Sequence, residues 1–262
     1  MKLQIIHINS EKGSEPYLDM FTRTLERIKR PDTEILPHRW AKLRRATDVV
    51  YAYPYLLNGV AIINEVVATA EAGEADGVMI ACTGDPGVVE ARTLVDIPVV
   101  GPWEATLHTA ATYGYKFGVI TVQERGWQEY CHSLVVKNGL IDRCAGLVGV
   151  DISSYDAFAR GFTDPEFVVA EVRTQAERLV EMGASAIAIG SAGLGTIVAD
   201  AGLTSVPGVD VPIFDALTVG LKTLEMRVDL TQKAGLPVMG RSGLYTRFGS
   251  EDASRVRHQT GF

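Results

Sequence analysis

Three short apolar runs constrain the fold of this chain more than any other feature of its sequence. They are Gly-Val-Met-Ile-Ala-Cys at 77–82, Lys-Phe-Gly-Val-Ile-Thr-Val at 116–122 and Ala-Ser-Ala-Ile-Ala-Ile-Gly at 184–190. None alternates between apolar and polar residues as a half-exposed strand does, so each predicts a strand that is covered on both faces. Such strands form parallel sheets with helices on both sides, which predicts an α/β fold.

The segments between these runs have the spacing of amphipathic helices. Residues 15–29 and 60–72 carry apolar side chains every three to four positions, so each predicts a helix with one buried face. Residues 164–182 predict a longer helix. Pro165 suits its first position, and Asp164 can cap its first backbone N–H groups.

The chain also repeats one structural unit. Each copy has a buried strand, a small polar residue, a glycine-containing turn and an Asp-Ile-Pro or Asp-Val-Pro sequence before another strand and helix. Cys82 and Asp96 belong to the first copy, Ser191 and Asp210 to the second. Two copies predict two pseudo-symmetric Rossmann-like lobes with parallel sheets, and an active site in the cleft between them. A chance similarity of two ordinary β-α-β segments is the alternative.

The first polar turn carries a thiol. The stretch Cys82-Thr-Gly-Asp-Pro-Gly87 follows a buried strand and opens the next helix. Backbone N–H groups at a helix N-terminus favour anions, so we expect them to lower the pKa of Cys82 and make it a better base or nucleophile. Asp85 suits the role of a helix cap better than a catalytic role. The alternative for Cys82 is a small thiol buried in the core.

The second polar turn has the same design with a hydroxyl in place of the thiol. It is the stretch Gly190-Ser-Ala-Gly-Leu-Gly195. Its backbone donors and the hydroxyl of Ser191 are expected to point into the same cleft as Cys82. An ordinary strand-to-helix turn is the alternative, because Gly and Ser are common turn residues.

No cofactor or metal is expected from the sequence. The glycine-rich turns do not match a P-loop, since no Lys-Ser or Lys-Thr follows Gly195, and they do not match a dinucleotide fingerprint. The histidines show no ligand spacing, and Cys131 and Cys144 lack a glycine turn. We therefore expect these two cysteines to be structural.

Composition excludes other classes of function. The net charge is −7 and there is no long run of Lys and Arg, which argues against nucleic acid as a partner. No stretch approaches the roughly 18 apolar residues of a membrane span, and the N-terminal apolar run is too short for a signal peptide. An odd number of cysteines, three, fits reduced thiols and predicts a cytoplasmic location.

With these motifs, the chain resembles the hydantoin racemases of the aspartate/glutamate racemase superfamily. The stretch Ile80-Ala-Cys-Thr-Gly-Asp-Pro-Gly87 is similar to the hydantoin racemase version of the cysteine turn. Supporting similarities lie at 98–101, 104–105, 117–122 and 211–215, and the resemblance covers roughly residues 1–227.

The resemblance implies a division into lobes and a set of site residues. One lobe comprises residues 1–101 plus 214–262, and the other comprises 102–213. It also implies a homo-oligomer and a small-molecule substrate. Cys82 and Ser191 are the expected catalytic residues. The expected substrate-binding residues are Asn9, Ser10, Thr83, Gly84, Thr121, Ala192 and Gly193.

The implied chemistry is cofactor-independent racemisation or isomerisation at a carbon next to a carbonyl, in a hydantoin-like ring or a small carboxylate. The family uses one thiol on each face of the substrate, whereas this chain has Ser191 where the second thiol is usual. The family's early Asn-Pro-Asn signature is reduced to Ile8-Asn-Ser10. A single-cysteine lyase, decarboxylase or hydrolase is therefore the first alternative, and a non-catalytic binder of small ligands is the second.

The C-terminal segment from about Asp229 has no counterpart in the repeat. It carries Arg241, Arg247, Arg255 and Arg257 among polar residues. We expect a lid or a contact arm whose arginines meet a substrate carboxylate or a neighbouring subunit. A disordered basic tail is the alternative.

Overall fold

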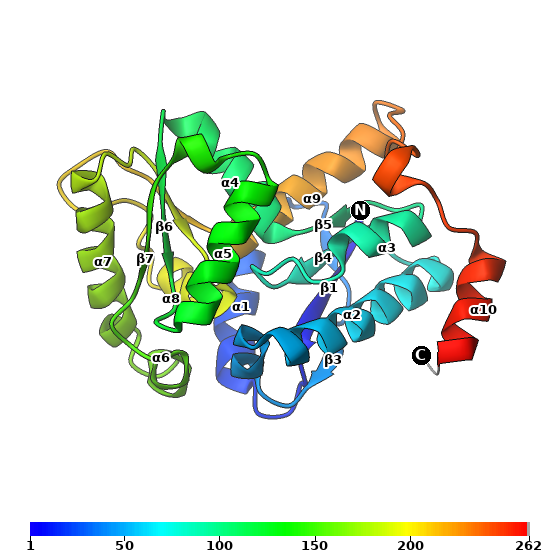
Figure 1. Ribbon diagram of the computed structural model, residues 1–262, viewed down its shortest axis with the longest axis horizontal. Coiled ribbons are helices and arrows are strands. Elements are labelled where there is room, and N and C mark those ends of the chain that lie inside the picture. Colours follow the sequence, from blue (N-terminus) through cyan, green and yellow to red (C-terminus); the bar gives the residue numbers. More distant parts are fainter. Residues whose placement is uncertain (261–262) are drawn as a thin grey trace.

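The computed structural model describes residues 1–260, which form two sheets of parallel strands (Figure 1). The first sheet has the strand order β2-β1-β4-β5, and β3 also pairs with β1. All of its pairings are parallel. Its strands are β1 (Lys2–Asn9), β2 (Glu34–Ile35), β3 (Arg39–Leu43), β4 (Gly77–Ala81) and β5 (Val99–Val100).

The second sheet has the strand order β7-β6-β8-β9, again with parallel pairings. Strands β4, β6 and β8 are buried along their whole length, which confirms the α/β class predicted from the unbroken apolar runs. The repeat is visible in the strand order, because β1-β4-β5 corresponds to β6-β8-β9. The strands are β6 (Phe117–Thr121), β7 (Cys144–Gly149), β8 (Ile187–Ile189) and β9 (Ile213–Asp215).

Helices cover both sheets. They are α1 (Glu15–Ile28), α2 (Ala52–Ala72), α3 (Val88–Leu94), α4 (Pro102–Tyr113), α5 (Arg125–Lys137), α6 (Ser154–Gly161), α7 (Pro165–Glu181), α8 (Ala192–Asp200), α9 (Ala216–Gln232) and α10 (Ser250–Thr260), with short 3-10 turns at η1 (Ala46–Val50), η2 (Ile141–Arg143) and η3 (Gly243–Tyr245). Within residues 1–260, no helix combines the length and the apolar character needed to cross a bilayer.

Helices α4 and α9 connect the lobes by crossing between them. Helix α4 follows β5 of the first sheet, yet its buried Trp103 packs in one cluster with Phe117 of the second sheet. Helix α9 follows β9 of the second sheet, yet Leu221 packs with Met79 of the first. Because each helix packs its apolar side chains against the sheet of the other lobe, the buried apolar surface holds the lobes together. The lobe boundaries at 101/102 and 213/214 stay a prediction.

The start of α7 differs from the prediction in its cap. Pro165 lies in the first turn, as predicted, and Asp164 stands at the N-cap position. The Asp164 carboxylate caps no backbone N–H and instead accepts two hydrogen bonds from the Arg160 guanidinium, at 2.9 and 2.6 Å. The capping prediction is wrong because this charge-assisted pair occupies the carboxylate.

The chain after α9 lies against the outer side of the first lobe, where Figure 1 shows α10 far from the second lobe. Arg241 donates hydrogen bonds to the carbonyl oxygens of Arg92 and Val95 at the end of α3. Arg241 and Arg247 both pair with Asp96. No described residue of this segment lines the cleft between the lobes. The prediction of a lid is therefore wrong, because these two arginines find their partners in their own chain.

Candidate active site

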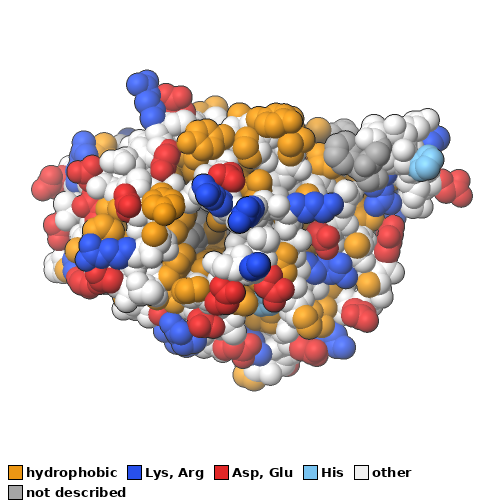
Figure 2. Space-filling model, turned by 90° about the horizontal axis from the view of Figure 1, so that it is seen from below, with side chains coloured by type: hydrophobic (Ala, Val, Ile, Leu, Met, Phe, Trp, Pro, Cys, Tyr) orange, Lys and Arg blue, Asp and Glu red, His pale blue; other side chains and the backbone are white. Residues whose placement is uncertain are grey.

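A cleft of about 460 Å³ lies at the carboxyl ends of β1, β4 and β8, where the sequence predicts the active site. Its walls come from the loop after β1, η1, the turn after β4, α6 and the start of α8. Figure 2 shows the hollow, with Lys and Arg side chains beside it. The lining includes the cationic residues Lys12, Arg44 and Arg45.

Cys82 follows β4 directly and is almost fully buried, with 2% of its surface exposed. Burial raises the pKa of the Cys82 thiol to about 12, against the smaller lowering effect of the Gly84 N–H, which donates to Sγ at 3.4 Å. The prediction of a lowered pKa is wrong. Helix α3 begins only at Val88, beyond the turn, so its N-terminus does not stabilise the thiolate. At neutral pH Cys82 is therefore a thiol.

Asp85 holds the cysteine turn to a different helix from the one predicted. Its carboxylate accepts hydrogen bonds from the backbone N–H groups of Trp103 at 3.0 Å and Glu104 at 2.7 Å, so it caps α4 rather than α3. Asp85 has a φ of 51°, which is unusual for a residue with a side chain. A Cβ on Gly101 would lie 2.5 Å from the Asp85 Cγ, so only glycine fits beside the carboxylate.

Gly84 faces away from the cleft. Its carbonyl oxygen accepts hydrogen bonds from the hydroxyl groups of Tyr55 at 2.7 Å and Tyr130 at 3.3 Å. A Cβ at this position would lie 2.8 Å from the Tyr55 ring and 3.0 Å from Trp127. The glycine therefore allows close packing behind Cys82, and it is not part of the cleft lining.

Ser191 is the N-cap of α8 and has 6% of its surface exposed. Its Oγ accepts a hydrogen bond from the Leu194 N–H at 3.3 Å, which is the usual role of a capping serine. The preceding Gly190 carbonyl accepts a hydrogen bond from Thr121 Oγ1 at 2.7 Å. Thr121 therefore supports this turn from behind and does not reach the cleft.

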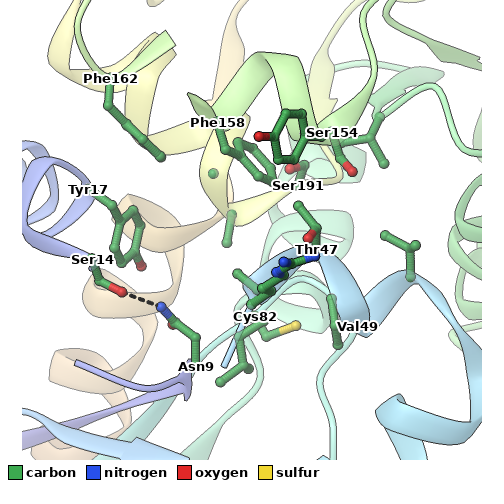
Figure 3. Close-up of a pocket in the computed structure, with 18 of the residues that line it drawn as sticks. Asn9, Ser14, Tyr17, Thr47, Val49, Cys82, Ser154, Phe158, Phe162 and Ser191 are labelled. Carbon is green, nitrogen blue, oxygen red and sulfur yellow. Dashed lines mark hydrogen bonds between the residues drawn. The ribbon is translucent and has the colours of Figure 1, made fainter. Parts of the chain in front are cut away.

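The predicted site residues divide into two groups. Ser10, Gly84 and Thr121 are not in the cleft lining, and Ser10 uses its backbone N–H to bond the Leu43 carbonyl of β3 at 2.8 Å. Figure 3 shows Asn9, Cys82 and Ser191 around one space. The predicted residues that line it are Asn9, Cys82, Thr83, Ser191, Ala192 and Gly193.

An aromatic wall of the cleft was missed from the sequence. Phe158 of α6 and Phe162, directly after this helix, stack with ring centroids 6.0 Å apart, and Phe162 meets Tyr17 of α1 edge to face at 5.8 Å. Residues so far apart in the chain give no local signal. The adjacent pair Arg44-Arg45 was the one available clue to the cationic side of the cleft.

Comparison with known proteins agrees with these features. A model of the family described as Asp/Glu/Hydantoin racemase matches residues 5–224 of the chain. The chain belongs to this family. Among curated proteins, it is 30% identical over 234 residues to a hydantoin racemase of Pseudomonas sp. (strain NS671), covering 89% of this chain and 88% of the relative. It is also 31% identical to a hydantoin racemase of Paenarthrobacter aurescens over 135 residues, 51% of this chain and 55% of that protein.

Two solved structures of allantoin racemases have the same fold as this chain. An allantoin racemase from Klebsiella pneumoniae superposes with a TM-score of 0.78 at 23% identity, covering 95% of this chain and 94% of the other. The allantoin racemase of Pseudomonas fluorescens gives a TM-score of 0.74 at 20% identity, with 95% and 97% coverage. Among the described residues, no group of three His, Cys, Asp or Glu side chains is arranged to hold a metal ion.

Proposed function

We propose that this member of the racemase family is a cofactor-independent racemase or isomerase that acts at a carbon next to a carbonyl in a hydantoin-like ring. The observation that carries the proposal is the thiol of Cys82 in a cleft between two lobes of matching strand order, with the Ser191 turn at the equivalent place. The names of its curated relatives support the hydantoin-like ring, as substrate of those proteins.

In this proposal, Cys82 exchanges a proton with one face of the substrate carbon. As a thiol at neutral pH, Cys82 acts first as the acid, and the thiolate it leaves is the base for the reverse reaction. The charge that develops on the substrate oxygen needs donors. The start of α8, where Ala192 and Gly193 line the cleft, supplies backbone N–H groups and the positive end of a helix dipole.

The rest of the cleft suits a ring with an apolar substituent. Phe158, Phe162 and Tyr17 offer a surface for the substituent, while Arg44 and Arg45 offer donors to ring oxygens or to the anion that forms on deprotonation. A small carboxylate would use the same cationic side of the cleft and leave the aromatic wall without a partner. This comparison favours a hydantoin-like ring.

A single-cysteine decarboxylase is a second candidate. The observation in its favour is that position 191 has a hydroxyl, whose oxygen already accepts the Leu194 N–H. An alcohol is a far weaker acid and base than a thiol near neutral pH. A decarboxylase needs a proton donor on one face only.

Incubation in D₂O tests the proposal. A panel of single-enantiomer hydantoins, arylmalonates and unsaturated diacids is incubated with the enzyme and followed by NMR and optical rotation. Deuterium incorporation at the α-carbon together with loss of rotation is the expected result for a hydantoin. Release of CO₂ from an arylmalonate, without exchange on any hydantoin, would contradict racemisation and favour the decarboxylase.

Two properties of the whole protein are further proposals, a homo-oligomeric state and a cytoplasmic location. Exposed apolar side chains on α2, including Tyr53 at 72% and Leu56 at 66%, support association with another copy. Light scattering after size-exclusion chromatography measures the mass directly, and a monomer at micromolar concentration would contradict the oligomer.

A further inference from the structure

A chain of polar side chains leads from the cleft to the surface. Tyr17 lines the cleft from α1, and its hydroxyl lies 3.3 Å from Nδ1 of His7 on β1. Nε2 of His7 lies 2.6 Å from Nδ1 of His38, which is partly exposed. None of these three residues was singled out from the sequence as part of the site.

His7 is an unusual residue for its surroundings. Only 1% of its surface is exposed, and its ring packs against Phe21 at 5.0 Å and Trp40 at 4.3 Å between centroids. Burial, and then the neighbouring His38, holds the pKa of His7 well below its ordinary value, so the ring is neutral. A neutral imidazole has one N–H donor and one acceptor nitrogen, and here each ring nitrogen has a partner.

One arrangement of protons satisfies all of these contacts. The Tyr17 O–H donates to Nδ1 of His7, and the Nε2–H of His7 donates to Nδ1 of His38. Burial raises the pKa of the Tyr17 hydroxyl, with a smaller contribution from Cys82, so the phenol keeps its proton at rest. The half-buried His38 ring then carries its remaining N–H on Nε2.

We propose that Tyr17 is the second acid/base of the site and that His7 and His38 connect it to solvent as a proton relay. This inference rests on the proposed racemase function and deepens it, because it supplies the group that the Ser191 substitution removes. Figure 3 shows Tyr17 and Cys82 on different elements around the same space. A base on each side of the substrate carbon is what inversion requires.

The proton transfers balance in the following order. The Tyr17 oxygen takes the α-proton while its own proton moves to Nδ1 of His7. The Nε2 proton of His7 moves to Nδ1 of His38, and His38 releases a proton to water. The electron pair left on carbon is delocalised into the adjacent carbonyl, and the Cys82 thiol then returns a proton to the opposite face. Solvent then reprotonates the thiolate, and the two imidazoles return to their starting tautomers before the next turnover. In the reverse reaction the thiolate takes the α-proton of the other enantiomer and the relay runs backward.

The relay explains why the charge does not accumulate in the core. A tyrosinate at Tyr17 or an imidazolium at His7 would be a buried, unpaired charge, which is costly. The concerted shift places the charge at His38, the member with access to water. Ser191 has no comparable connection, since the contact of its Oγ is the Leu194 N–H.

The first test uses the separate enantiomers of 5-benzylhydantoin in D₂O. The wild type is expected to exchange the α-proton of both enantiomers. Tyr17→Phe removes one oxygen atom, so exchange of one enantiomer should fall by about 100-fold or more, and exchange of the other should stay within about threefold. Tyr113→Phe, the same change at an exposed position of α4, is the control and should exchange both. Equal loss for both enantiomers, or loss for neither, would overturn the proposal.

The second test addresses the relay itself. His38→Ala should reduce the same one-sided exchange as Tyr17→Phe, and added imidazole should restore part of it, because His38 is accessible to solvent; His132→Ala is the matched control. Absence of rescue would contradict the relay.

If the wild type exchanges no hydantoin, the proposed function fails, and ¹⁵N NMR of the His7 ring decides the relay separately. A neutral His7 whose Nδ1 resonance shifts in Tyr17→Phe supports it; a cationic or unshifted ring overturns it.

Discussion

The turns after β4 and β8 occupy equivalent places in sheets of the same strand order, yet they are built differently. The turn of Cys82 runs through Asp85 and Gly87 before α3 begins, and the Asp85 carboxylate caps α4. The turn of Ser191 leads at once into α8, and Ser191 itself is the cap. Helix α9, the equivalent of α4, is capped by its own Asp215, which accepts the Thr218 N–H at 2.8 Å.

This difference shows that residues at equivalent positions of a repeat can have different roles. In the first copy α3 begins beyond the turn and has no side-chain cap, which leaves Cys82 without a structural duty. In the second copy the hydroxyl of Ser191 satisfies a backbone N–H of α8, a task that a serine does well and a thiol does less well. The second copy therefore has a structural reason for serine, which fits the proposal that Tyr17 transfers the proton on that side.

The strongest test of the difference between the two turns is to remove the thiol of Cys82. Cys82→Ala is expected to reduce turnover of a hydantoin by about 10³-fold, because it removes the acid/base of one face while deleting little buried volume. Steady-state kinetics and thermal unfolding measure activity and fold together. Cys144→Ala, the control at a partly buried thiol outside the cleft, should keep near-full activity. Near-full activity of Cys82→Ala would contradict the proposed mechanism.

The burial of Asp85, whose carboxylate caps α4 from the first turn, predicts that the stability of the fold depends on pH. Burial raises the pKa of Asp85 to about 7, against two backbone hydrogen bonds that lower it. A carboxyl whose folded pKa lies above its unfolded value stabilises the fold most at low pH. The free energy of unfolding of the wild type, relative to Asp85→Asn, should therefore fall between about pH 4 and pH 7, by at most about 1.4 kcal/mol per pH unit.

Urea unfolding of both proteins at several pH values checks this. The difference between the two proteins isolates Asp85, because the other titrating groups are shared. A constant difference across the range would show that Asp85 ionises with an ordinary pKa.

The equivalence of the two turns can be tested by adding the missing thiol. In a Tyr17→Phe background, Ser191→Cys should restore about tenfold of the lost one-sided exchange, because a thiol titrates several pH units below an alcohol. Deuterium incorporation into each enantiomer of 5-benzylhydantoin is the measurement. Restoration on the Cys82 face, or none at all, would mean that position 191 does not reach the opposite side of the substrate carbon.

The smallest expected effect separates capping from catalysis at Ser191. Ser191→Ala should lower the free energy of unfolding by about 1 kcal/mol, the usual cost of a lost N-cap, and should change turnover by less than about tenfold. Chemical denaturation and kinetics on the same preparation measure both. Ser191→Asp, which keeps a capping oxygen, should recover the stability. A loss of turnover as large as that of Cys82→Ala would instead make Ser191 an essential acid/base.

The fold and the place of the site could be predicted because their signals are local. An unbroken apolar run such as residues 77–82 has few structures available other than a strand covered on both faces, and a glycine turn after it marks a strand end. Parallel strands bring their carboxyl ends to one edge of each sheet, and the repeat places Cys82 and Ser191 at equivalent edges of the two lobes, so both could be assigned to one cleft. The repeat could be recognised from the order of residues along the chain, without any distance between them.

Two predictions of helix caps failed because the fold gives each carboxylate a different partner. Asp85 was expected to cap the helix beside it in sequence, whereas α4 offers free N–H groups across the turn. Asp164 was expected to cap α7, but Arg160 one turn earlier binds its carboxylate. A capping residue binds whichever donor the fold brings nearest, and sequence distance does not determine that.

The sequence by itself determined the layers of the fold, the two equivalent turns and the identity of the groups on them. Only the tertiary structure decided the state of those groups. Burial makes Cys82 a thiol at neutral pH, although its position at a glycine turn suggested the opposite. Packing of β1 against α1 and β3 joins His7 to Tyr17 and His38, which no spacing in the sequence indicates. Strand and turn patterns come from neighbours in the chain, whereas pKa values and proton paths come from neighbours in space.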